Sequence, residues 1–247
     1  MTKPKVLYFS PEVILYPLLL VLAMWIVFWA EIRFSWDFTF LGIYPRKLSG
    51  IFGVLAGPFI HGSLKHLFNN SVPLFVLSSG LFYFYRNMRW KVLIYGLILS
   101  GLLTWLIGRP AIHIGASGVV YMLAAFLFFK GIFSKQYSLI AFSLVVVFLY
   151  GGLLWYVMPI DPRISWEGHL SGFLIGLILA AVFKELPVEN AKYEWEKEDY
   201  KPEEDDFLKQ FDENGNFIEK LPVEKVSDLQ NNVEVIYTLK QNKDSDL

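Results

Sequence analysis

Long apolar runs separated by short polar connections fill the first three quarters of the chain. Roughly 20 consecutive apolar residues cross a bilayer as an α-helix, whereas the strands of a membrane barrel are much shorter. The runs lie at about residues 12–31, 66–86, 90–108, 115–133, 137–157 and 168–185. This pattern predicts an all-α membrane protein with a bundle of six transmembrane helices.

The second, fourth and sixth runs each begin with polar residues. These starts carry His66 with Asn70, then Ser117, then His169. Because successive transmembrane helices run in opposite directions, we expect the three starts at one face of the membrane. Polar side chains in a bilayer are tolerated when they face the bundle interior. We therefore expect these groups to point toward one another.

The composition changes near residue 185. Residues 1–184 hold 14 Lys/Arg and 5 Asp/Glu, a formal charge of +9, whereas residues 185–247 hold 8 and 18, a formal charge of −10. We predict a six-helix domain over 1–185 and an acidic cytoplasmic tail over 186–247. The tail is expected to be partly disordered or to form a small β unit, with a hairpin at Asn214-Gly215 and a strand near 233–237.

Basic residues near the ends of the runs predict the orientation of the helices. Arg86, Arg89 and Lys91 lie in one short connection, and Lys130 and Lys135 lie in another. Basic residues in short connections favour the cytoplasmic side, so we expect both termini in the cytoplasm and the polar helix starts outside. Scattered basic residues of this kind do not indicate nucleic-acid binding.

The long first loop, at about 32–65, is itself apolar, and we expect it to lie partly in the membrane interface or to pack on the bundle. A plain surface hairpin is the alternative. The chain has 55% hydrophobic residues and no cysteine, so an ordinary soluble domain and a disulfide framework are both excluded.

Ser117 is the candidate nucleophile. It lies in the first turn of the fourth run, where backbone N–H groups lack intrahelical partners and the helix dipole is positive. Both properties favour an oxyanion beside the serine. Gly115 and Gly118 allow close approach of another backbone. A simple packing contact of small residues is the alternative for this motif.

His169 is the candidate general base. Gly172 and Gly176 follow it at a spacing that favours tight helix packing. Packing against the fourth run would place the imidazole beside the serine. Tyr121, four residues after the serine, shares that helix face and could stack on the imidazole. Glu167, two residues before His169, points elsewhere, so the residues predict a Ser–His dyad without a third acid.

His66 and Asn70 share one face of the second run and are candidate oxyanion donors. Interhelical hydrogen bonding is the alternative role for this pair. Another candidate, His61, precedes the same run, whereas His113 has no role that the sequence suggests.

Together these motifs resemble the rhomboid family of intramembrane serine proteases. The residues that carry the resemblance are His61, His66, Asn70, Gly115, Ser117, Gly118, Tyr121, Gly168, His169 and Gly172. The resemblance implies a six-helix bundle in which Ser117 is the nucleophile, His169 the base, and His66 and Asn70 the oxyanion donors. His61 matches a supporting position. The family's Trp-Arg pair is absent from the first loop, where Arg46 is a poor substitute.

The sequence therefore predicts an endopeptidase that cleaves single-span membrane proteins, in a bacterial inner membrane and without a metal or cofactor. A rhomboid-like pseudoprotease, which binds membrane clients without cleavage, is one alternative. A metal or haem protein that uses the histidines is another, although no H-E-x-x-H motif is present.

Overall fold

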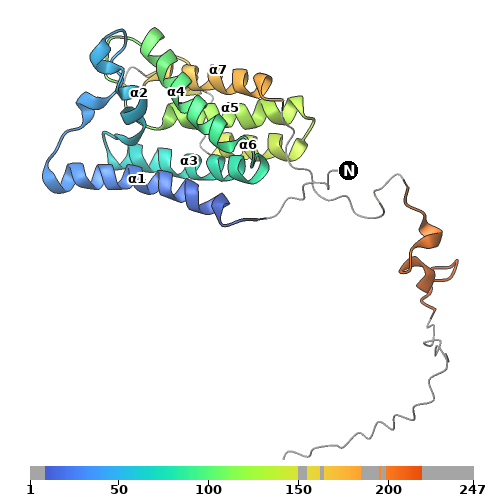
Figure 1. Cartoon of the computed structure of the whole chain (residues 1–247). Coiled ribbons are helices and arrows are strands. Elements are labelled where there is room, and N and C mark those ends of the chain that lie inside the picture. The colour runs from blue at the N-terminus through green and yellow to red at the C-terminus, as the bar shows by residue number, and fades with distance from the viewer. Residues whose placement is uncertain (1–8, 150–154, 162–163, 185–194, 196–198, 219–247) are drawn as a thin grey trace, which may run out of the picture. The chain divides into compact units, whose positions relative to one another are not determined.

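The computed structural model describes residues 9–149, 155–161, 164–184, 195 and 199–218. These residues form seven α-helices and no β-strand (Figure 1), which confirms the all-helical prediction. The chain divides into two compact units, Met1–Ala191 and Lys192–Leu247. The domain boundary predicted at 185 lies outside the described residues.

Six of the helices follow the six apolar runs of the sequence. They are α1 (Glu12–Phe34), α3 (Leu64–Phe84), α4 (Arg89–Ile107), α5 (Ser117–Phe133), α6 (Tyr137–Leu149) and α7 (Trp166–Val182). By length and composition, α1, α3 and α4 suffice to cross a membrane, whereas α5, α6 and α7 are apolar but shorter. The six-span count therefore stays a prediction.

Helix α5 is the central helix of the first unit. It packs against α3, α4, α6 and α7 (Figure 1). Its residues are apolar around most of the circumference, and Met122, Leu123 and Phe126 are fully buried. A helix that is hydrophobic on all sides belongs in the interior of a bundle. The outer helix α1 contacts α3 and leaves most of its apolar surface exposed.

Helices α5 and α7 approach each other most closely. A Cβ atom added at Gly172 would overlap the carbonyl oxygen of Gly118, and one added at Gly176 would overlap that of Met122. Only glycine permits backbones this close. The predicted tight packing of these two glycines is therefore present, and it sets the first turns of α5 and α7 side by side.

The first loop packs on the bundle through its backbone. Ile43 and His113 form an isolated antiparallel bridge, and the Gly115 amide donates to the Gly57 carbonyl, 2.9 Å away. The loop contains α2 (Gly53–Ala56) and three short 3-10 turns, which the sequence did not predict. The hairpin alternative for the loop is wrong, since its described residues form short helical turns.

Arg46 has a structural role in the same loop. Its Nη1 donates to the carbonyls of Leu106 and Gly108, at 3.3 and 2.8 Å. These carbonyls lie at the end of α4, where a cation is favourable because of the helix dipole.

In the second unit, a tight turn lies at Asn214-Gly215, as predicted. Gly215 has a positive φ of 82°, and Phe211 bridges Phe217 across the turn. The turn carries one isolated bridge in place of two strands. The strand predicted near 233–237 lies outside the described residues.

Candidate active site

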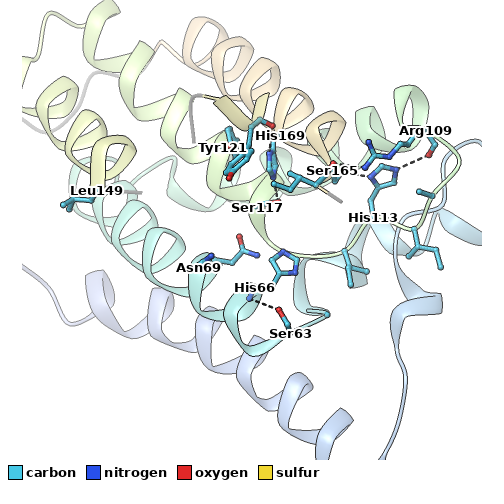
Figure 2. Close-up of a pocket in the computed structure, with 17 residues that line it drawn as sticks. Ser63, His66, Asn69, Arg109, His113, Ser117, Tyr121, Leu149, Ser165 and His169 are labelled. Carbon is cyan, nitrogen blue, oxygen red and sulfur yellow. Dashed lines mark hydrogen bonds between the residues drawn. The ribbon is translucent and has the colours of Figure 1, made fainter. Parts of the chain in front are cut away.

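A cavity of about 890 Å³ lies where α3, α5 and α7 begin (Figure 2). Its lining includes His66, Asn70, Ser117, Tyr121 and His169. The three polar helix starts therefore share one end of the bundle, which follows from the alternating direction of the helices. The structure brings all five of these side chains to one cavity.

Ser117 and His169 are hydrogen-bonded to each other. The Oγ atom of Ser117 is 2.9 Å from Nε2 of His169, and His169 Nδ1 is 2.8 Å from the carbonyl oxygen of Tyr156. Since a carbonyl only accepts, we assign the ring proton to Nδ1. The unprotonated Nε2 then accepts from the serine hydroxyl, which is the arrangement that a general base requires.

Tyr121 fixes the plane of the imidazole. Its ring lies parallel to that of His169, with centroids 4.2 Å apart and an interplanar angle of 14°. Both side chains are buried. The stacking surface and the hydrogen bond at Nδ1 together leave the histidine little freedom to rotate.

Asn70 and His66 lie against Gly115, on the loop that leads into α5. A Cβ atom added at Gly115 would lie 2.6 Å from His66 Nε2 and 3.3 Å from Asn70 Nδ2. Asn70 is 5% exposed, and its Nδ2 is buried with no hydrogen-bond partner among the described residues. Such a buried unused donor is costly. It could donate to a group that enters the cavity, because Asn70 lines that cavity.

A family model, described as the Rhomboid domain, matches residues 48–185, more than half of the chain. The chain belongs to the rhomboid family. The apolar helices and the family together indicate an integral membrane protein.

Similar proteins occur in mycobacteria. Uncharacterized proteins of Mycobacterium tuberculosis (strain ATCC 25618 / H37Rv) and Mycobacterium bovis are each 40% identical over 153 residues, which cover 56% of this chain. A Mycobacterium leprae protein is 35% identical over 156 residues, again 56% of this chain. The chain covers 62% of the length of the first two relatives and 59% of the third.

His61 lies in the first loop, with its side chain next to His66. Its ring lies 5.0 Å from that of His66, centroid to centroid, at an angle of 63°. Its Nδ1 is 3.3 Å from the Phe59 carbonyl. Burial, together with the charge of the neighbouring histidine, lowers the pKa of His61 to about 4. The ring is therefore neutral at physiological pH.

Gly118 is the remaining predicted position, and it serves helix packing. Its carbonyl faces Gly172 of α7, and a Cβ atom added at Gly118 would lie 3.3 Å from the carbonyl oxygen of Gly168. It belongs to the contact that joins α5 to α7 and does not itself line the main cavity described above.

The sequence did not reveal three further features, namely the Tyr156 carbonyl, the His113–Ser165 contact and the Arg109–Glu167 pair. The Tyr156 carbonyl has no sequence signal, because every residue carries one. His113, which had no suggested role, lies 2.5 Å from Ser165 Oγ through Nδ1. Glu167 points away from His169, as predicted, and toward Arg109. The sequence did offer a signal for the Arg109–Glu167 pair, because a basic residue precedes the serine motif and an acidic residue precedes the histidine motif.

The described histidine, aspartate and glutamate side chains include no group of three or more that could hold a metal ion.

Proposed function

We propose that this rhomboid protein is an intramembrane serine endopeptidase that cleaves transmembrane segments of membrane proteins. The observation that supports this most strongly is the 2.9 Å contact between Ser117 Oγ and His169 Nε2 inside a cavity at the helix starts. A serine beside a correctly oriented imidazole is the minimum requirement for nucleophilic acyl transfer.

Acylation begins with transfer of the Ser117 proton to Nε2 of His169 as Oγ attacks the scissile carbonyl. The Tyr156 carbonyl accepts from Nδ1–H and stabilises the imidazolium, the role that a carboxylate has in a triad. The carbonyl oxygen of the substrate becomes an oxyanion. The first backbone N–H groups of α5 and the free Nδ2 of Asn70 are its donors, with His66 beside them.

The leaving amine then takes the proton from His169 Nε2 as the C–N bond breaks, which leaves an acyl ester on Ser117. Water, deprotonated by the same nitrogen, attacks the ester, and the serine regains its proton. The cavity is open enough to admit this water, and its lining combines polar and apolar side chains.

The substrates that fit this site are single-span membrane proteins. A helical peptide bond is protected by its own hydrogen bonds, so local unwinding must precede attack. The site lies at the ends of α3, α5 and α7, close to a membrane face, where a small residue near the end of a substrate helix unwinds at low cost. We further propose that the protein crosses the bacterial inner membrane six times and has both termini in the cytoplasm.

A pseudoprotease that holds clients without cleavage is the alternative. The test is reconstitution of the full chain in liposomes with a panel of single-span membrane proteins. We expect products with the wild type and none with Ser117→Ala. A stable complex of wild type and client, without product and unchanged by the substitution, would favour the pseudoprotease.

A further inference from the structure

We propose that two polar links between the loop that precedes the serine and the start of α7 position the catalytic base, and thereby set the rate of acyl transfer. One link joins Arg109 to Glu167, and the other joins His113 to Ser165. None of these four side chains touches the reacting atoms, so all four are positioning residues. This inference rests on the proposed protease function.

The first link combines an ion pair between two side chains with a hydrogen bond from the Arg109 backbone amide. The Arg109 amide donates to Glu167 Oε1 at 3.2 Å, and the guanidinium Nε lies 3.8 Å from the same oxygen. Arg109 Nη2 donates to the Ile164 carbonyl at 2.7 Å. Glu167 is only 2% exposed. A carboxylate so buried is stable only when it is paired, which forces Arg109 to stay at the start of α7.

The second link is a directed chain of hydrogen bonds (Figure 2). The Gly168 amide donates to Ser165 Oγ at 3.3 Å, and that hydroxyl lies 2.5 Å from His113 Nδ1. His113 Nε2 lies 3.2 Å from the Arg109 carbonyl. A neutral imidazole offers one donor and one acceptor. The chain is satisfied when Nε2–H donates to the carbonyl and Nδ1 accepts from the hydroxyl.

The protonation of His113 fits this arrangement. Burial lowers the pKa of His113 below its ordinary value, as does the Arg109 charge, against the opposing effects of the Arg109 carbonyl and Glu167. The ring is thus neutral at physiological pH. Every polar atom in this series of hydrogen bonds then has a partner of the right kind, so the link is rigid.

The spacing of the links explains what they fix. His113 lies four residues before the serine, and Ser165 lies four residues before the catalytic histidine. The glycine contacts bring α5 and α7 together. The links join the segments that lead into these helices, next to the first turns in which the reacting groups lie. A misplacement of about 1 Å at such a site can cost on the order of a hundredfold in rate.

Fluorophosphonate inactivation of the full chain in liposomes tests the first link, because it separates the limiting rate of serine modification from probe affinity. We expect Glu167→Met to lower the limiting rate at least about tenfold with unchanged affinity. Glu167→Gln, which keeps the acceptor oxygen, restores most of the rate. The matched control is Glu12→Met, which breaks the ion pair of Glu12 with Arg89 between α1 and α4 and leaves the rate unchanged.

The second link is tested with Ser165→Ala and His113→Leu. Each is expected to lower the limiting rate by a similar factor, and the double variant is no slower than the singles, because both remove the same link. Ser165→Thr keeps the hydroxyl and the helix cap, and retains the rate. His113→Leu leaves the cap on the Gly168 amide in place, which separates the link from capping.

The inference would be overturned if Glu167→Met, Ser165→Ala and His113→Leu all kept the wild-type limiting rate while their thermal midpoints equalled that of Glu12→Met. If Glu167→Met does not fold, the Ser165 and His113 variants decide. Failure of the proposed function gives a different result, namely no labelling of the wild type, or equal labelling of Ser117→Ala, and it removes the basis of this inference as well.

Discussion

Gly115 is the residue on which the proposed placement of the oxyanion donors depends most closely. Its φ of +103° lies in a region that other residues rarely adopt, and its Cα faces His66 and Asn70. The glycine brings the backbone ahead of Ser117 against two side chains at once. Any Cβ would push the donors away from the place where charge develops.

We therefore expect Gly115→Ala to lower the rate of substrate cleavage by about tenfold or more, since loss of an oxyanion donor costs on the order of a hundredfold. The matched control is Gly215→Ala, which has the same backbone strain, at φ +82°, with nothing within 4 Å. Cleavage at the wild-type rate by Gly115→Ala would contradict the placement of His66 and Asn70.

His61 makes stability depend on pH in a predictable direction. The pKa is about 4 in the folded protein and 6.5 for the free side chain. Below pH 6.5 the imidazole binds a proton in the unfolded chain but stays neutral in the folded protein. The contribution of His61 to the free energy of unfolding is therefore full above pH 6.5 and is lost as the pH falls toward 4. We expect the thermal midpoint in detergent to fall less steeply over this window in His61→Asn, which keeps a donor for the Phe59 carbonyl. Parallel slopes would show that His61 is not the titrating group.

At the scale of elements, the α5–α7 contact brings serine and histidine together across 52 positions of sequence. Gly172 and Gly176 bring the backbones of the two helices into direct contact. These two glycines of α7 thus bring Ser117 and His169 together, although they carry no polar side chain themselves.

Gly172→Ala is expected to separate the first turns of α5 and α7, because the new methyl group meets the Gly118 carbonyl and the overpacking costs about 1–3 kcal/mol. Both the thermal midpoint and the cleavage rate should fall. Ala181→Val, an enlargement on the exposed side of the same helix, leaves both unchanged. Equal behaviour of the two variants would contradict the role assigned to this contact.

The sequence predicted the long helices well and the first loop poorly, for a physical reason. Apolar runs set α1, α3, α4, α5 and α7 to within a few residues, because length and hydrophobicity are local properties. Helix α6 is described only to Leu149, short of the predicted 157. The turns of the first loop depend on nonlocal contacts, such as Gly53 against the backbone at Gly42, which no local pattern reveals.

For the candidate site, side-chain partners followed from spacing, whereas backbone partners did not. Tyr121 was predicted beside Ser117 because helix periodicity places both on one face, and His169 because alternate helices begin at the same membrane face and Gly172 and Gly176 favour tight packing. The Tyr156 carbonyl could not be predicted, since its position depends on the path of the chain between α6 and α7. His113 was overlooked because its partner, Ser165, belongs to no motif that marks it in the sequence.

At the scale of the whole molecule, the proposed function requires the starts of α3, α5 and α7 to face one side of the membrane. The natural chain has no cysteine, so single cysteines report topology without background. Leu48 in the first loop and Tyr137 at the start of α6 are both more than 80% exposed. They should lie on opposite sides of the bilayer.

We expect a membrane-impermeant maleimide to label Leu48→Cys in intact cells, and to label Tyr137→Cys only after lysis. The reverse pattern would invert the orientation and place both termini outside. Labelling of both positions in intact cells would contradict the alternation of the helices itself.

The most direct measurement is the site of a fluorophosphonate adduct, mapped by mass spectrometry on the full chain in liposomes. We expect one adduct, on Ser117, which Ser117→Ala abolishes. His169→Ala lowers its rate of formation at least a hundredfold, because an unassisted hydroxyl is a weak nucleophile. An adduct on another residue, or a wild-type rate in His169→Ala, would contradict the proposed function.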